Sequence, residues 1–480
     1  MSSATSSRRP NILLISSDSM DGRIMGCAGH PAANTPNFDR LASEGVLFQN
    51  AYCNSPQCCP SRASMWSGKH VFSCEAWNNY KGLEPGDPTF QTCLDDAGYD
   101  THIIGRTDHL SGRHSWNVRL NAWLREANVA GQQKAGPKQR FGVEETDEVR
   151  FSETDWVRVE ETVEWLRARA KSPGDPFFLS VGFLQPHPSF VTTPYWLDRI
   201  DPNKVTLPPV DEASHPVLEF MKIAKGCTDE LTDEETLLIR RIYYAMVAEV
   251  DAMVGEIVEA LQDTGLGDST WVINISDHGE MNLEHGQYLK NSLYESSVRV
   301  PLIVNGPDAQ AGCVIEHPVS LVDIFPTLMD MAGASKPDWL EGRSLMPELT
   351  GAPSRHPDWV LSEYHSNFQN TGSFMLRSGK WKYIVYVGYE PQLFDVEEDP
   401  EEVRNLAPVM AEIVRKLDEK LRGIVDYEEV DARAKAYDRR NFVAWRAAAS
   451  DEEYNEKMRQ AIRGYGDDDE AKVRTWLAKG

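Results

Sequence analysis

The 480-residue sequence predicts a large α/β domain followed by a smaller C-terminal α+β domain. Short apolar runs alternate with helix-like stretches through most of the chain, a pattern typical of strands and helices that form separate layers. Apolar residues make up 41% of the chain and charged residues 26%, ordinary values for a folded protein. Two prolines interrupt the pattern within residues 352–358. We therefore expect a first domain over residues 1–355 and a second over residues 356–480.

Five apolar runs are the candidate strands of the first domain, at residues 11–16, 101–104, 177–181, 271–275 and 301–304. The clearest helix spans residues 233–264, where apolar side chains recur every three or four positions. Thr232 and Glu235 form a capping-box pattern at its start, and Gly265 marks its end. In the C-terminal part, residues 372–376 and 381–387 predict a hairpin, and alternating acidic and basic residues predict helices to the end.

Charge and cysteine content exclude several functions. The net charge is −25, which argues against a nucleic-acid binder or a protein that adheres to anionic membranes. Eight scattered cysteines are too few for a disulfide framework, so reduced thiols are expected. No run approaches the ~18 apolar residues of a membrane span. The apolar run after the N-terminus is too short for a signal peptide, so the sequence predicts a cytoplasmic protein.

Polar residues follow four of the expected strands. Asp18 follows the first strand, and Asp277-His278 follow the strand at residues 271–275. Arg106 and Asp108 come after the strand at residues 101–104, and His187 comes after the strand at residues 177–181. Ligands of α/β sheets bind beyond the carboxyl ends of the strands, so four such groups predict one shared site.

Asp18, Asp277 and His278 suit a divalent cation. Two carboxylates from separate strands could hold a hard cation such as calcium between them. An imidazole is an unusual calcium ligand, so these residues alone leave manganese and zinc open. A loop imidazole bonded to the backbone is the other interpretation of His278.

The most specific pattern is the segment from Ser55 to Gly68, which contains Cys58-Cys59-Pro60-Ser61-Arg62. Proline is favoured in the first turn of a helix, so Cys58 is predicted at a helix N-terminus, where the dipole lowers a thiol pKa. Arg62, one turn later, would add positive charge beside it. A structural cysteine pair, a vicinal disulfide and a soft-metal site are the generic alternatives.

Cys58-x-Pro60-Ser61-Arg62 resembles the signature of the sulfatases, in which the first cysteine is oxidised to formylglycine. Further segments resemble those of sulfatases in the same order: residues 17–23, 54–56, 276–280, 284–285, 294–295 and 300–302, together with Lys290. The resemblance covers residues 10 to about 407. It implies an alkaline-phosphatase-like fold with a large mixed, mostly parallel sheet, a calcium ion, and a formylglycine-generating enzyme as partner.

The resemblance also implies roles for individual residues. Arg62 would orient the hydrated aldehyde at position 58, Lys290 would bind sulfate, and His187 would donate a proton to the leaving oxygen. Arg106 and Asp108 stand at substrate-binding positions where many sulfatases have Lys and His. His365 is a further candidate for sugar contact. The implied calcium ligands are Asp18, Ser19, Asp277, His278 and the oxygen at position 58, with Ser19 replacing a carboxylate found in many relatives.

These features predict a sulfatase that acts on sulfated sugars or aryl sulfates. Residues 77–79, 81–83, 243–246 and 381–384 resemble the glucuronate-2-sulfatases, which implies 2-O-sulfated uronic acids from glycosaminoglycan degradation as substrates. For the uronate carboxylate we expect Arg106 as partner, because guanidinium grips an oxyanion in a bidentate fork. Arg113 and His114 could assist, although solvation at the surface is the more ordinary interpretation of both. The alternatives are a phosphomonoester or phosphonate-ester hydrolase, and a non-catalytic protein that binds sulfated ligands.

Overall fold

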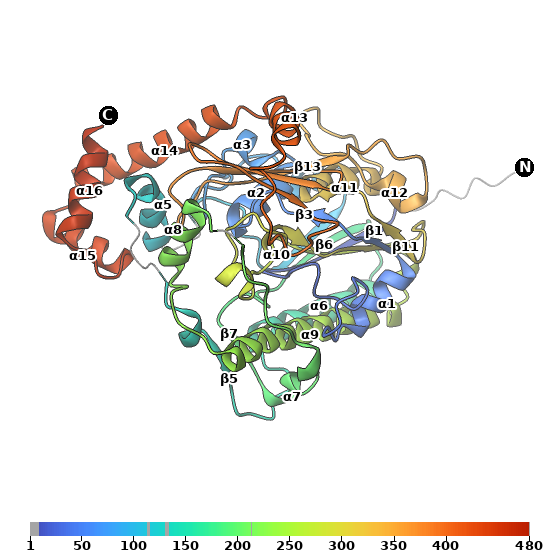
Figure 1. Cartoon of the computed structure of the whole chain (residues 1–480). Helices are drawn as coiled ribbons and strands as arrows, with labels where there is room; N and C mark the ends of the chain where they lie inside the picture. Colours follow the sequence, from blue (N-terminus) through green and yellow to red (C-terminus); the bar gives the residue numbers. More distant parts are fainter. Residues whose placement is uncertain (1–8, 113–115, 130–133, 213, 480) are drawn as a thin grey trace, which may run out of the picture.

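The computed structural model describes residues 9–112, 116–129, 134–212 and 214–479 and has the expected α/β architecture (Figure 1). Four neighbouring strands of the central sheet, β8, β1, β6 and β4, run parallel, and β10 runs antiparallel to both of its neighbours. The full strand order is β11 (Cys313–Ile315), β2 (Val46–Phe48), β10 (Leu302–Asn305), β8 (Thr270–Ser276), β1 (Asn11–Ser17), β6 (Phe177–Gly182) and β4 (Asp100–Gly105).

Strand β1 shows how the sheet is covered on both faces. Leu13 and Ile15 pack in one core with α1 (Pro36–Glu44), α6 (Glu153–Lys171) and α9 (Asp233–Asp263). Ile12 and Leu14 point to the opposite face and pack with α2 (Cys58–Ser67), α4 (Phe90–Asp96) and α11 (Ile324–Ala332). Because alternate side chains of a strand face opposite sides, a strand covered on both faces is a continuous apolar run.

Helix α9 confirms the longest predicted helix. Thr232 Oγ1 accepts a hydrogen bond from the backbone N–H of Glu235, and the Glu235 carboxylate accepts one from the N–H of Thr232. This capping box satisfies donors that the first turn leaves unpaired. Beyond the last turn Gly265 has a φ of 70°, a left-handed conformation that glycine adopts without strain.

A second, antiparallel sheet follows in the order β13 (Trp359–Tyr364), β14 (Ser373–Ser378), β15 (Trp381–Tyr386) and β16 (Gln392–Asp395). Strands β14 and β15 are the predicted hairpin. Met375 shares a core with β1, whereas Phe374 and Leu376 face α13 (Ala411–Arg422). One face of this sheet thus packs on the first part of the chain, and the boundary between residues 1–355 and 356–480 stays a prediction.

The last helices reach back to an earlier part of the chain. Helices α14 (Tyr427–Ala448), α15 (Asp451–Ala461) and α16 (Asp467–Ala478) form a separate core with α5 (Trp116–Trp123), at one end of the molecule (Figure 1). Trp123 and Phe442 are buried there, edge to face. Helix α5, which lies between β4 and α6 in the chain, is therefore supported by the C-terminal helices.

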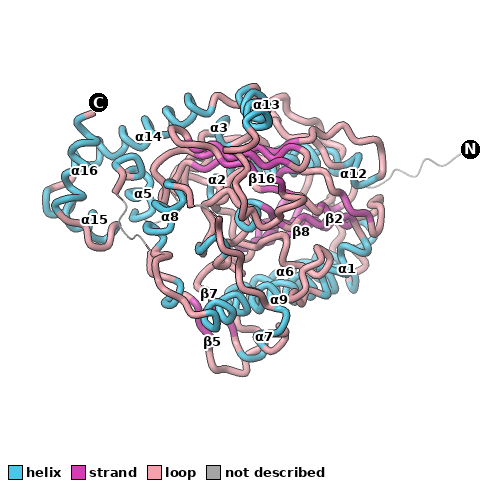
Figure 2. Tube along the Cα trace, in the orientation of Figure 1, coloured by secondary structure: helices cyan, strands magenta, loops and turns pink. Residues whose placement is uncertain are grey.

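The remaining elements are short, and their strands form one three-stranded and one two-stranded sheet (Figure 2). None of the described helices is both long and apolar enough to cross a membrane. The short strands are β3 (Ala51–Tyr52), β5 (Phe141–Val143), β7 (Phe190–Thr192), β9 (Arg299–Val300) and β12 (Val319–Ser320). The short helices are α3 (Val71–Cys74), α7 (Pro194–Leu197), α8 (Pro216–Lys225), α10 (Glu295–Val298) and α12 (Met346–Thr350). Single 3-10 turns lie at Arg125–Ala127, Pro137–Gln139, Pro202–Lys204, Gly267–Ser269, Glu284–Gly286 and Leu321–Asp323.

Candidate active site

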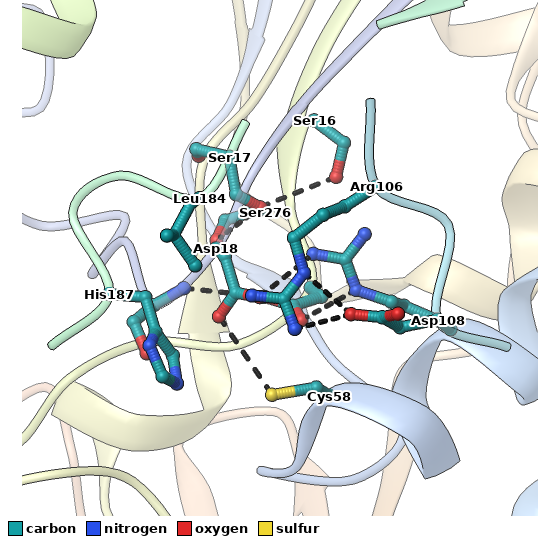
Figure 3. A network of polar contacts seen from close by, with 12 residues as sticks. Ser16, Ser17, Asp18, Cys58, Arg106, Asp108, Leu184, His187 and Ser276 are labelled. Carbon is teal, nitrogen blue, oxygen red and sulfur yellow. Dashed lines mark hydrogen bonds and ion pairs between the residues drawn. The ribbon is translucent and has the colours of Figure 1, made fainter. Parts of the chain in front are cut away.

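The polar groups that follow the parallel strands lie together at one edge of the central sheet. Asp18 comes directly after β1, and Asp277 comes directly after β8, which pairs with β1 in parallel. Figure 3 shows Asp18 between His187 and Arg106, with Cys58 nearby on its helix. The carboxyl ends of parallel strands meet at one edge, and this topology brings together residues far apart in the sequence.

Helix α2 presents Cys58 to this group. Cys58 is its first residue and Pro60 lies in its first turn, as predicted. The side chain of Asn79 accepts a hydrogen bond from the N–H of Cys59 (3.0 Å), which satisfies one unpaired donor of the helix start. The hydroxyl of Ser61 donates to the backbone oxygen of Asp277 (2.5 Å) and ties the helix to the end of β8.

Four buried side chains form a group that can hold a metal ion: Asp18, Cys58, Asp277 and His278 offer ligand atoms within 4.8 Å of one another. Nε2 of His278 lies 3.3 Å from the Cys58 sulfur, 3.7 Å from Asp18 Oδ1 and 3.5 Å from Asp277 Oδ2. Nδ1 of His278 donates to the backbone oxygen of Gly279 (3.0 Å). That bond leaves Nε2 with its lone pair toward the group, the usual arrangement of a ligating histidine.

The charges around the group keep Asp18 ionised. Burial alone would raise the pKa of Asp18, but the neighbouring basic groups His187, Arg62, Arg106 and Lys290 outweigh burial and hold this pKa well below its usual range. Asp18 is therefore ionised at neutral pH, as a metal ligand must be. The donor set of two carboxylates and one imidazole fits a hard divalent cation and, as expected from the sequence, does not by itself separate calcium from manganese or zinc.

Ser19 was the fifth predicted ligand. Its hydroxyl lies 3.5 Å from Nδ1 of His278 and 3.5 Å from Nζ of Lys290. The Ser19 hydroxyl thus lies beside Nδ1, whereas the carboxylates lie beside Nε2 of the same imidazole. Ligation by Ser19 stays a prediction. Tyr243 of α9 holds the backbone at residues 19–21: its hydroxyl donates to the backbone oxygen of Ser19 and accepts from the N–H of Asp21.

Two arginines complete the charge balance around the carboxylates. Arg62 is almost fully buried and bridges them, with Nε 2.9 Å from Asp277 Oδ2 and a terminal nitrogen 3.2 Å from Asp18 Oδ2. A terminal nitrogen of Arg106 lies 3.5 Å from Asp18 Oδ2, and its Nε donates to Asp108 (2.5 Å). Arg106 and its partner Asp108 are therefore part of the network around the carboxylates (Figure 3).

The environment of the Cys58 thiol corrects one expectation. The helix N-terminus was expected to lower its pKa, yet burial and the negative charge of Asp18 raise the pKa of Cys58 to about 12. The thiol is protonated at neutral pH and is a weak nucleophile in this form. All eight cysteines are free, which excludes a vicinal disulfide between Cys58 and Cys59 in this structure.

A pocket of about 170 Å³ opens onto this group. Four predicted site residues line it: Cys58, Arg106, His187 and Lys290. His187 donates from Nδ1 to the oxygen of Pro188 (2.9 Å), so its Nε2 is the nitrogen that can exchange a proton. Burial and the charge of Lys290 lower the pKa of His187 well below its usual value.

The pocket also contains residues that sequence reasoning did not select: Gln57, Asn79, Val118, Lys134, Arg140, Pro188, Leu289, Asn291, Asn367 and Phe368. Proximity in sequence to Cys58, His187 and Lys290 could have suggested Gln57, Pro188 and Asn291. Lys134 and Arg140 lie in a polar stretch without a recognisable motif, so no local signal identifies them.

His365 does not line this pocket. Its Nε2 lies 2.8 Å from the Glu363 carboxylate, and its ring contacts Trp77 edge-on. It is buried beside the second sheet, so its predicted sugar contact has no support from the geometry. Arg113 and His114 lie outside the described residues.

Comparisons with known proteins agree with this geometry. The model of the sulfatase family matches residues 10–334, and the model of the N-sulphoglucosamine sulphohydrolase C-terminal region matches residues 283–426. The first match spans more than half of the chain and contains every residue of the metal-ligand group. The chain therefore belongs to the sulfatase family.

Individual relatives narrow the class. Arylsulfatase K of Bos taurus is 40% identical over 463 residues, which cover 91% of this chain and 85% of the relative. Similarity at this level makes the chain a sulfuric ester hydrolase. The phosphonate monoester hydrolase of Agrobacterium radiobacter has a similar structure, with a TM-score of 0.72, 26% identity, and coverage of 89% of this chain and 96% of that one. A 2-O GAG sulfatase aligns with a TM-score of 0.69 and 25% identity over 89% of this chain and 94% of its own.

Proposed function

We propose that this protein hydrolyses the 2-O-sulfate of sulfated uronic acids, using a formylglycine made from Cys58 and a calcium ion. The observation that carries the proposal is the position of Cys58. It begins a helix at the base of the pocket, with its sulfur 3.3 Å from Nε2 of His278 and 3.8 Å from Asp18 Oδ1.

Two groups would supply chemistry that the unmodified side chains lack. A hydrated formylglycine supplies two hydroxyls on one carbon, one to attack sulfur and one whose deprotonation releases the sulfate. A calcium ion, which Asp18, Asp277 and His278 would hold, would supply positive charge to polarise the sulfate ester. The proposed partner that makes the first group is a formylglycine-generating enzyme.

The other residues of the pocket would bind the sulfate ester and protonate its leaving group. Lys290 and Arg106 line the pocket and provide positive charge for sulfate oxygens. Arg62 keeps both carboxylates in place from the side away from the pocket, which it does not line. His187 would donate a proton from Nε2 to the alkoxide that leaves. A bound sulfate adds negative charge near this imidazole and favours the protonated form that the step requires.

The size and charge of the pocket support a sugar acid as substrate. At about 170 Å³ the pocket is small beside the ~300–1,000 Å³ of typical ligand pockets, so it suits a single sugar ring. Arg106, Lys134, Arg140 and Lys290 all line it, in a protein of net charge −25. This concentration of positive charge suits a ligand with more than one anionic group. The 2-O GAG sulfatase among the similar structures supports the same ring position.

The test is sulfate release from a disaccharide with a terminal 2-O-sulfated uronic acid, by protein co-produced with a formylglycine-generating enzyme. We expect turnover that depends on calcium and is absent in Cys58→Ala. It should exceed turnover of the isomeric disaccharide that carries its sulfate at O6 of the other sugar. Turnover by Cys58→Ala would contradict the mechanism, and a preference for the 6-O-sulfate would contradict the substrate.

One structural neighbour favours a second candidate function. The similarity to a phosphonate monoester hydrolase makes phosphonate esters the alternative substrates. Measuring an aryl sulfate and an aryl phosphonate side by side separates the two, and we expect the sulfate to be hydrolysed with the larger kcat/KM. A larger value for the phosphonate would favour the alternative.

A further inference from the structure

Two cationic side chains of the pocket, Lys134 and Arg140, take no part in the network around the carboxylates. They lie between α5 and β5, in the segment that follows the helix packed against the C-terminal helices. Both line the pocket that contains Cys58 and Lys290. The pocket is therefore lined both by groups from the strand ends and by these two residues from the segment between α5 and β5.

These two cations differ from the arginines beside Asp18, because no described residue gives either of them an anionic partner. Arg62 and Arg106 each pair with carboxylates, whereas no carboxylate among the described residues forms an ion pair with Lys134 or Arg140. Nε of Arg140 is buried and lacks a hydrogen-bond partner within the described part of the chain. Burial, Arg140 and Lys290 together lower the pKa of Lys134. Like charges that face one pocket without a counter-ion repel each other, and a bound anion would relieve that repulsion.

Lys134 and Arg140 form a second group of positive charge in the pocket. Asp18, Cys58, Asp277 and His278 offer ligand atoms within 4.8 Å of one another, and Arg62 and Arg106 pair with the carboxylates of that group. Among the described residues, no hydrogen bond or ion pair joins Lys134 or Arg140 to it. The pocket therefore has two cationic regions, one beside the metal-ligand group and one that Lys134 and Arg140 form.

The chemistry of a 2-O-sulfated uronic acid requires the same separation. In a pyranose ring C2, which carries the sulfate, lies opposite C5, which carries the carboxylate. When the sulfur lies at Cys58, the carboxylate is therefore held at the far side of a pocket that suits one ring. Arg106 lies beside Asp18, at the sulfate end, and is poorly placed for this second anion.

We propose that Lys134 and Arg140 bind the carboxylate of the uronic acid and thereby select sulfated uronates over sulfated sugars that lack a carboxylate. The proposal rests on the proposed function, because it takes the sulfate to lie at Cys58. A guanidinium and an ammonium that converge on one carboxylate give charge-assisted hydrogen bonds, among the stronger polar contacts in proteins.

The test compares two substrates that differ only at C5: glucuronate 2-sulfate and glucose 2-sulfate, both as the same glycoside. The measured quantity is the ratio of their kcat/KM values in wild type, Lys134→Gln, Arg140→Gln and Arg140→Lys. We expect each Gln variant to lower this ratio about ten- to a hundredfold, which corresponds to about 1.4–2.8 kcal/mol. Arg140→Lys is expected to keep most of the preference. Lys138→Gln is the matched control, since Lys138 lies in the same segment but pairs with Glu235 at the surface.

An unchanged ratio in both Gln variants, or an equal fall in the control, would overturn the proposal. Loss on both substrates to the same degree would do so too, because it would indicate a structural role. Binding of the two sulfated sugars to Cys58→Ala, measured by calorimetry, gives a second readout without turnover. If wild type hydrolyses neither sugar but Cys58→Ala still prefers the uronate through Lys134 and Arg140, the proposed function fails while this assignment stands.

Discussion

Replacement of Arg62 tests whether the two carboxylates of the site depend on one buried guanidinium. Arg62 touches Asp277 at 2.9 Å and Asp18 at 3.2 Å, and its side chain is 2% exposed. Arg62→Ala would leave two buried carboxylates without this partner, for which a loss of about 3–5 kcal/mol in the free energy of unfolding is expected. Arg62→Lys keeps the positive charge, but its single ammonium replaces a guanidinium that contacts Asp18 and Asp277 through two different nitrogens. Loss of one charge-assisted bond corresponds to about 1.5–3 kcal/mol, or roughly ten- to a hundredfold in kcat/KM.

The assay is urea unfolding of the metal-free protein, together with aryl sulfate turnover in the presence of calcium. Calcium should stabilise Arg62→Ala more than wild type, because the ion replaces the missing positive charge between the carboxylates. Arg125→Lys is the matched control, since buried Arg125 similarly lies between Asp431 (3.6 Å) and Asp438 (2.9 Å), outside the pocket. It should lose stability but retain turnover. A metal-free Arg62→Ala within about 1 kcal/mol of wild type would refute the reasoning.

Four further predictions follow from the same structure. Peptide mass spectrometry of active protein should find an aldehyde at Cys58 and an intact thiol on the neighbouring cysteine; the reverse would shift the assignment by one residue. Asp18→Asn removes one charged ligand and should abolish the rise in melting temperature that calcium gives wild type, whereas an unchanged rise would place the ion elsewhere. Arg106→Lys should lower turnover of sulfated uronates and aryl sulfates alike, because its guanidinium contacts Asp18 at the sulfate end; a selective loss on uronates would place it at the carboxylate. Although burial acts to lower it, a 2.9 Å hydrogen bond to Asp323 raises the pKa of His356, so the pair's contribution to stability is present below about pH 6.5 and is lost as the pH rises through the folded-state pKa. Urea unfolding at pH 5.5 and 8 should show a smaller difference in His356→Gln than in wild type, and an equal difference would contradict this.

The sequence predicted the parts of the fold and site that local patterns determine. Helix α9 has a capping box and a regular apolar stripe, so its limits agree with the prediction to within a residue. Asp18, Asp277 and His278 directly follow apolar strands, and the parallel topology brings them together as expected. The pKa of Cys58 was predicted in the wrong direction, because the helix dipole can be read from sequence whereas burial beside Asp18 cannot.

The residues that escaped prediction are those that tertiary packing alone brings to the pocket. Lys134 and Arg140 lie in a polar segment between α5 and β5, and α5 packs against α14, α15 and α16, which follow the residues matched by the family models. The groups that perform the chemistry come from the strand ends, where the geometry of the sheet leaves little freedom. The groups that we assign to sugar selection come from the segment between α5 and β5. Such a division lets the substrate preference change without moving the metal-ligand group, so variants at Lys134 and Arg140 should alter which sulfate ester is hydrolysed before they alter the hydrolysis itself.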